Sequence, residues 1–176
     1  MSIYIALLRS INVGGHNKVK MAELKILLEE MRLDKVKTYI QSGNVLFESE
    51  DDAMFLRKGL EERIEERFGF RVPVVLRTSE EWESVIRDCP YSPDGLQEGE
   101  SINVAFLGDE PSEEGVERLN SYQSEMDHFQ IIEKNVYLFF RHSIRDSKLA
   151  ANLPKLGVPA TVRNWNTVLK LGELAK

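Results

Sequence analysis

The sequence predicts an α+β protein built from two ferredoxin-like (βαββαβ) modules. Each half of the chain alternates short apolar runs with amphipathic stretches in the order β-α-β-β-α-β, followed by one more helix. Three segments of the first half also have counterparts in the second half, in the same order. The matched pairs are residues 4–8 with 103–107, 43–47 with 134–138, and 72–77 with 158–163. A repeat of this length is typical of a duplicated domain, and chance similarity between apolar strands is the alternative.

In the first half, strands are expected where apolar or β-branched residues run together, and helices where apolar residues recur three or four positions apart. The turn residues at 41–44, Gln-Ser-Gly-Asn, predict a tight hairpin, and Pro73 places the strand that contains it at a sheet edge. The expected strands are residues 3–8, 36–40, 45–47 and 72–77; the expected helices are residues 21–32 and 51–67, then a short helix capped by Thr78 or Ser79.

In the second half, the same rules indicate all but one of the expected elements. The internal repeat adds a strand at residues 160–163 that its own residues do not indicate. Residues 89–99 contain two prolines and two glycines and are the expected linker. The modules are then residues 1–88 and 100–176, expected to pack as one unit. The other expected elements are strands at 102–107, 128–132 and 136–141, and helices opening at 111–114, covering 147–153, and covering 165–174.

The net charge of -6 is unevenly distributed along the chain. Residues 1–47 carry +3, residues 48–134 carry -14, and residues 135–176 carry +5. The acidic middle argues against a protein that coats nucleic acid without specificity, because that activity needs clustered Lys and Arg. A fold that brings the two basic ends together would form one surface that attracts anions.

Cysteine usage and apolar runs indicate a cytoplasmic protein. Cys89 is the one cysteine, which excludes an internal disulfide and favours a reducing compartment. The apolar run at residues 3–8 is too short for a signal-peptide core or a membrane span, so no membrane partner is expected. The three histidines lack the spacing of metal ligands, so no metal is expected, and no cofactor is indicated.

Three blocks of the sequence resemble the bacterial proteins known as domain of unknown function 1697. They are ALLR-x-INVGG-x-NKV-x-M-x-x-L at residues 6–24, TYIQSGNV at 38–45, and TVRNWNT at 161–167. The sequence departs from the family pattern at Ser10, where the family has Gly, and at Arg32-Leu33, where a Gly usually ends the first helix. The resemblance implies a duplicated ferredoxin-like fold. It implies no established activity and no catalytic residues.

The loop at residues 9–20 is the first candidate site. It contains three Lys or Arg side chains and no Asp or Glu. Basic side chains beside free backbone N–H groups suit a phosphate or carboxylate, although the loop matches no known nucleotide-binding motif. The alternative is a structural loop in which asparagines satisfy backbone groups and glycines supply positive φ angles. The ligand-binding residues predicted here are Arg9, Asn12, Gly14, Gly15, Asn17, Lys18 and Lys20.

The strand-to-helix junction at Arg163, Asn164 and Trp165 is the second candidate site. An arginine beside an aromatic side chain can stack a base and bind its phosphate. The alternative is that Trp165 belongs to the core and Asn164 only caps the helix. We expect this junction and the 9–20 loop to meet in space as one anion site, because both lie in basic parts of the chain.

The function that these patterns favour is a cytoplasmic binding module. Its expected ligand is a phosphate-bearing small molecule or a short single-stranded nucleic acid. Two alternatives from other classes remain open: an enzyme with a site between the two modules, and a scaffold for protein interactions. The sequence leaves the oligomeric state and the existence of any catalysis open.

Overall fold

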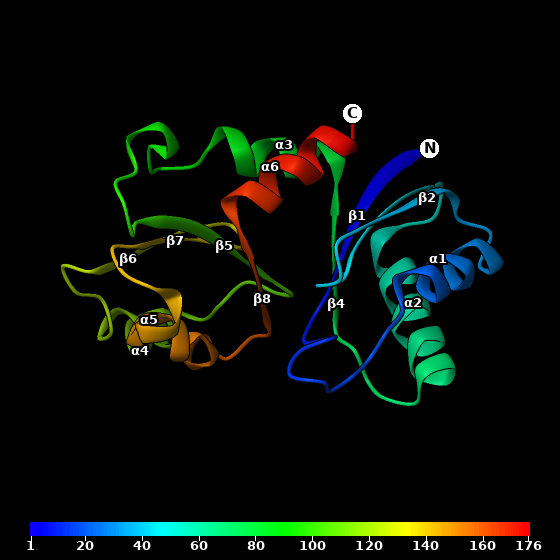
Figure 1. The fold of residues 1–176 in the computed structure, drawn as a ribbon, viewed down its shortest axis with the longest axis horizontal. Helices are drawn as coiled ribbons and strands as arrows, with labels where there is room; N and C mark the ends of the chain where they lie inside the picture. The colour runs from blue at the N-terminus through cyan, green and yellow to red at the C-terminus, as the bar shows by residue number, and fades with distance from the viewer. The chain divides into compact units, whose positions relative to one another are not determined.

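The computed structural model describes all of residues 1–176. The chain forms two compact units: Met1–Ser84 with Lys170–Lys176, and Val85–Leu169. Each unit contains one four-stranded antiparallel sheet with helices packed against it (Figure 1). The predicted fold class, α+β with duplicated ferredoxin-like modules, is confirmed. The boundaries between the two units fall within α3 (Ser79–Arg87) and within α6 (Trp165–Leu174). The division into modules at a linker of residues 89–99 stays a prediction.

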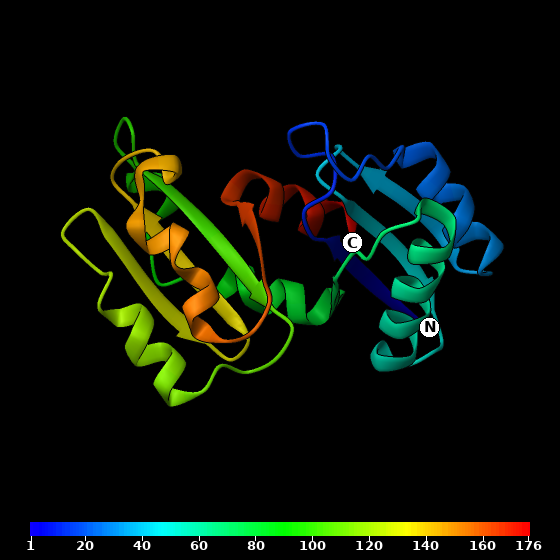
Figure 2. The same cartoon turned by 90° about the horizontal axis from the view of Figure 1, so that it is seen from below.

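The first unit has the strand order β2-β3-β1-β4. Its helices α1 and α2 lie side by side on one face of this sheet (Figure 2). Pro73 directly precedes β4, which is an edge strand, as the proline predicts. The elements are β1 (Ser2–Leu8), α1 (Met21–Glu30), β2 (Asp34–Tyr39), β3 (Asn44–Ser49), α2 (Ala53–Phe68) and β4 (Val74–Thr78), followed by α3.

The second unit has the equivalent order β6-β7-β5-β8. Its second crossover contains the four-residue helix α5 where the first unit has the 16-residue α2. The elements are 3-10 helix η1 (Pro93–Gly95), β5 (Ser101–Leu107), α4 (Glu113–Asn120), β6 (Asp127–Ile132), β7 (Asn135–Phe140), η2 (Ile144–Asp146), α5 (Lys148–Ala151), η3 (Leu153–Leu156), β8 (Ala160–Asn164) and α6.

The two sheets repeat each other in register and in the hydrogen bonds at their ends. Ala6 pairs with Val45 and Leu76, and its counterpart Ala105 pairs with Val136 and Val162. The sequence alignment of the halves pairs the same positions. The central strands β1 and β5 also make equivalent backbone hydrogen bonds at their C-terminal ends. They are Leu8 N to Gly43 O at 2.8 Å and Arg9 N to Pro73 O at 3.0 Å, matched by Leu107 N to Lys134 O at 2.8 Å and Gly108 N to Pro159 O at 3.2 Å.

The helices form where apolar residues recur on one face, and local polar groups set their ends. Leucines 24, 27 and 28 of α1 join the core with Leu56, Leu60 and Ile64 of α2. The Asp52 carboxylate accepts from Phe55 N at 2.9 Å, so α2 begins two residues later than the expected start at Asp51. Gly69, in the left-handed conformation, ends α2. Helix α1 ends at Glu30, before the expected end at Arg32, because Arg32 has a φ of +63°.

A buried carboxylate organises the second crossover of the second unit. Asp127 hydrogen-bonds His142 Nε2 through Oδ1 at 2.7 Å and accepts from Ser147 Oγ through Oδ2 at 2.9 Å. Ser147 Oγ also accepts from Ala150 N and caps α5, which is shorter than the expected helix at residues 147–153. Gly115 of α4 makes room for the Leu156 carbonyl, which a Cβ atom would clash with. A short turn can therefore pack where a longer helix lies in the first unit.

The outer strands β2 and β6 are both modified at their free edges. The register of β2 shifts between Asp34 and Lys37, where Lys35 has a φ of +50°. On β6, the Gln123 side chain accepts from Phe129 N at 3.3 Å, and Ser124 N donates to Asp127 O at 3.0 Å. Part of each edge is therefore unsuited to pairing with another strand.

Replacing Gly43 with alanine should destabilise the protein by about 2–4 kcal/mol. Gly43 has a φ of +95°, and a Cβ atom there would lie 2.8 Å from both Leu8 Cβ and Ile11 Cδ1. The cost combines the left-handed strain of a non-glycine residue with overpacking. Urea unfolding measures it. The matched control is Gly69→Ala, where φ is +84° but no atom lies within 4 Å, and which should cost only about 1 kcal/mol. Equal losses in the two variants would contradict the close packing at Gly43.

Candidate functional site

The Asn12 side chain holds the 9–20 loop and the β2–β3 turn together. Its Nδ2 donates to Val19 O at 2.9 Å and to Gln41 O at 2.8 Å, while its Oδ1 accepts from Val19 N at 2.8 Å. Asn12 N donates to Asn17 O, and Asn17 Nδ2 donates to Ser10 O at 3.3 Å. Both asparagines therefore satisfy backbone groups, which is the role that the structural alternative assigns to them. The Asn12 carboxamide is therefore occupied by backbone groups of the loop and of the β2–β3 turn.

Left-handed backbone conformations allow the 9–20 loop to turn sharply. Five residues between positions 10 and 17 have a φ between 50° and 78°, and between them His16 N closes a turn onto Val13 O at 2.9 Å. Two of the five are glycines, which adopt such angles without strain. The five are Ser10, Asn12, Gly14, Gly15 and Asn17.

Two buried apolar side chains anchor the loop to the core, and the lysines lie beside one of them. Ile11 and Val19 belong to the hydrophobic core of the first unit. Lys18 and Lys20 flank Val19 in sequence and are both exposed. The side chain of Val19 is buried and its backbone is hydrogen-bonded to Asn12. The backbone positions of the two neighbouring lysines are therefore held in place.

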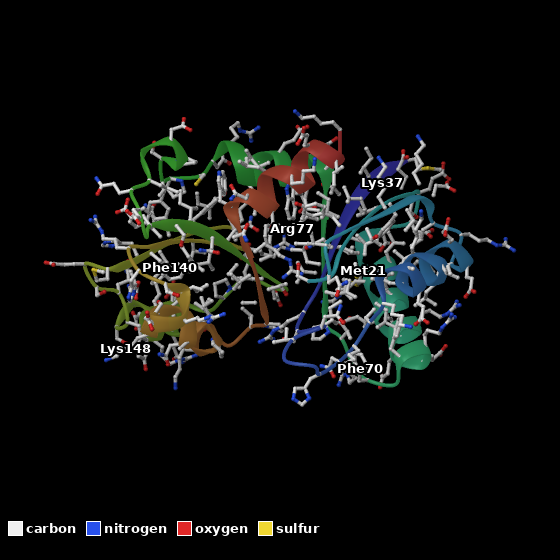
Figure 3. The ribbon with its side chains drawn as sticks, in the orientation of Figure 1. Met21, Lys37, Phe70, Arg77, Phe140 and Lys148 are labelled. Atoms are coloured by element: carbon white, nitrogen blue, oxygen red, sulfur yellow. The ribbon has the colours of Figure 1, made fainter.

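A pocket of ≈ 570 Å³ opens beside this loop, at the start of α1. Its lining contains two lysines and no carboxylate. Met21, one of the apolar lining residues, stands at the first position of α1 (Figure 3). The lining residues are Asn12, Gly15, Lys18, Val19, Lys20, Met21, Ala22 and Gln41.

The first turn of α1 lies at this pocket. Lys20 occupies the N-cap position, and its side chain makes no capping hydrogen bond. Met21 and Ala22, the first two helical residues, line the pocket. Side chains cap other helices of the chain, among them Asp52 at α2 and Ser112 at α4. The positive end of the α1 dipole thus adds to the charge of the two lysines.

Four of the seven predicted loop residues line the pocket: Asn12, Gly15, Lys18 and Lys20. Arg9, Gly14 and Asn17 lie on the same loop but outside the pocket lining. Sequence reasoning missed Gln41, which it assigned only to a hairpin turn. No local pattern marks this residue, because it reaches the loop through a hydrogen bond that spans 29 positions.

The three predicted junction residues belong to the second unit. Arg163 is buried, burial lowers its pKa to about 10, and its Nη1 donates to Val162 O at 3.0 Å. Asn164 Oδ1 accepts from Thr167 N at 2.9 Å and so caps α6. The Trp165 side chain is only 7% exposed. The expectation that this junction and the 9–20 loop form one site stays a prediction.

A second pocket, of ≈ 600 Å³, lies along α2 in the first unit. It has three glutamates beside two basic residues, and Glu61 Oε2 already accepts from Val74 N at 3.2 Å. This mixture of charges suits an anion less well than the pocket beside the loop does. The lining residues are Lys58, Glu61, Glu62, Glu65, Arg71, Val72 and Pro73.

Burial raises the pKa values of one thiol and two tyrosine hydroxyls in the second unit. It raises the pKa of the Cys89 thiol, raises the pKa of Tyr91 to about 12, and raises the pKa of Tyr137 further. A thiol with a raised pKa is a poor nucleophile. No group of His, Cys, Asp and Glu has a geometry that could hold a metal ion. None of the helices has the length and apolarity needed to cross a bilayer.

The fold and the pocket define a duplicated ferredoxin-like protein with one basic cavity in its first unit. The chain belongs to the family described as Protein of unknown function (DUF1697), which matches residues 1–137, so the predicted family is confirmed. A solved structure, that of the conserved bacterial protein SP0830 from Streptococcus pneumoniae, is similar to it. The two are 29% identical, cover 99% of each other, and superpose with a TM-score of 0.81. No curated protein matches the chain.

Ser10→Gly and Arg32→Gly should each stabilise the protein by about 0.5–1 kcal/mol. Both residues have left-handed φ angles, +57° and +63°. Ser10 stands where the family pattern has Gly, and Arg32 belongs to the pair Arg32-Leu33, where a Gly usually ends the first helix. Glycine removes the strain, and its greater freedom in the unfolded chain offsets part of the gain. Urea unfolding of each variant measures the change. A loss of stability in either would mean that the side chain makes a contact worth more than the backbone strain.

The free energy of unfolding should fall as pH rises from about 10 to 12, in part through Tyr91. Burial raises the pKa of Tyr91 to about 12, so the unfolded chain, with a pKa near 10, releases this proton first. Below pH 10 the side chain is neutral in both states and contributes no dependence. Urea unfolding at pH 9 and pH 11 should show a smaller difference for Tyr91→Phe than for the unaltered protein. Identical differences would exclude this contribution.

Proposed function

We propose that the protein is a cytoplasmic module that binds a phosphate-bearing ligand in the pocket beside the 9–20 loop. The observation that carries the proposal is the lining of this ≈ 570 Å³ pocket, which contains Lys18 and Lys20 and no carboxylate. The chain as a whole has a net charge of -6. A local excess of positive charge on an acidic protein directs an anion to one place.

The lysines are well placed to bind an anion because the loop that bears them is held in one shape. Asn12 fixes the backbone of Val19, which lies between them, through two hydrogen bonds. A site that is ordered before binding loses less conformational entropy when the ligand arrives. One lysine about 4 Å from a phosphate at a protein surface contributes roughly 1–4 kcal/mol before desolvation. The backbone donors at the start of α1 add to this attraction.

Binding is favoured over catalysis by what the pocket lacks. Apart from the two lysines, its lining has no titratable side chain and no hydroxyl or thiol that could act as a nucleophile. The enzyme alternative therefore has to use one of these two lysines or a different place in the molecule.

The protein-interaction alternative has one observation in its favour. Met54 and Phe55, in the first turn of α2, are 76% and 65% exposed. Adjacent exposed apolar side chains of this size occur at interfaces with other proteins. This alternative predicts no response to any phosphate-bearing compound.

Replacing Lys18 and Lys20 together with alanine should abolish ligand binding and leave the melting temperature of the free protein nearly unchanged. Both side chains are exposed and make no ion pair, so their loss removes charge without removing packing. The measurement is a thermal-shift screen of nucleotides, sugar phosphates and single-stranded oligonucleotides at two salt concentrations. Ligands that bind through charge should raise the melting temperature less at the higher salt concentration.

The matched control is the double variant Lys25→Ala/Lys58→Ala, which removes two exposed lysines of the same unit away from the pocket. It changes the net charge equally and should leave binding intact. If both double variants weaken binding to the same extent, the effect is one of overall charge and the pocket is not the site. If no compound raises the melting temperature, the proposed function is wrong and the interaction alternative gains support.

A further inference from the structure

We infer that the ligand of this pocket is an adenine mononucleotide, whose base lies on the apolar part of the lining and is recognised by the Gln41 side chain. This inference rests on the proposed function, since the lysines are taken to hold the phosphate. It goes further because it assigns roles to lining residues that carry no charge.

The pocket is amphipathic. Met21 and Ala22 supply apolar surface next to Lys18 and Lys20, and the largely buried Val19 belongs to the same lining. A sugar phosphate carries hydroxyls around its whole ring, and those placed against this surface would lose water without gaining a partner. A nucleobase presents an apolar face instead. The Met21 thioether can contact an aromatic ring favourably and adapt to its position.

Gln41 supplies the polar group that can recognise the edge of the base. Its backbone oxygen accepts from Asn12 Nδ2 at 2.8 Å, which fixes the residue at the pocket, while its side chain is exposed. A carboxamide has a donor and an acceptor side by side. It therefore matches adenine, which offers an acceptor at N7 and a donor at N6. Guanine offers two acceptors at the corresponding atoms, so the carboxamide can satisfy only one of them.

The size and charge of the pocket favour a free nucleotide over a strand. A volume of ≈ 570 Å³ lies within the range of pockets for single small molecules. Two lysines suit the charge of one or two phosphates. A longer strand would place further phosphates beyond the two lysines, which are the only positive charges of the lining.

Isothermal titration calorimetry on the full chain tests the inference with AMP, GMP, ribose 5-phosphate, inorganic phosphate and oligo(dA). AMP should bind at least about tenfold more tightly than ribose 5-phosphate and about fivefold more tightly than GMP. In Gln41→Ala, AMP affinity should fall about five- to tenfold and the preference over GMP should disappear. Affinity for inorganic phosphate should not change. This variant keeps the contact with Asn12, because Gln41 makes that contact through its main chain.

The outcomes separate this inference from the proposed function. If AMP and ribose 5-phosphate bind equally, and Lys18→Ala/Lys20→Ala removes both, the pocket binds phosphate but the assignment of an adenine nucleotide is wrong. If oligo(dA) binds more tightly per site than AMP and Gln41→Ala has no effect, a strand is the ligand and the inference is overturned. If none of the five compounds binds, the proposed function fails as well.

Discussion

The hydrogen bonds of the Asn12 carboxamide are the constraint on which the candidate site depends. They join the start of the 9–20 loop, at Asn12, to its end, at Val19, and tie both to the β2–β3 turn. A loop with five left-handed residues would otherwise have many conformations of similar energy. These bonds and the buried side chains of Ile11 and Val19 favour the conformation that the loop adopts. The position of the lysines, and the presence of Gln41 next to them, follow from that conformation.

The duplication explains why one copy can carry a site and the other need not. Both sheets end on the same backbone hydrogen bonds, so the copies share a framework. The connection from β1 to α1 has 12 residues and three basic side chains, while the connection from β5 to α4 covers only residues 108–112 and has two acidic ones. The basic loop is therefore an elaboration of the first copy. The second copy instead shortens its other crossover around Asp127.

Most of the fold could be predicted from the sequence because it depends on local patterns and on their repetition. The strand β8 shows the value of the repeat, since residues 160–163 resemble a strand only beside residues 74–77. The end of α1 could not be located, because a positive φ at Arg32 is not a property of arginine. The lysines of the pocket could be predicted from the charge of the loop. Gln41 and Met21 could not, since only the folded hairpin and helix place them beside it.

The interruptions at the edges of β2 and β6 affect how the protein behaves at high concentration. The irregularity of β2 at Lys35 and the bonds that Gln123 and Ser124 make to β6 interrupt the row of donors and acceptors along these two edges. A growing fibril recruits its next molecule through an open row of such groups. At these two places the sheets offer only short, interrupted rows. Pairing between copies through the β2 and β6 edges is therefore disfavoured when the protein is concentrated.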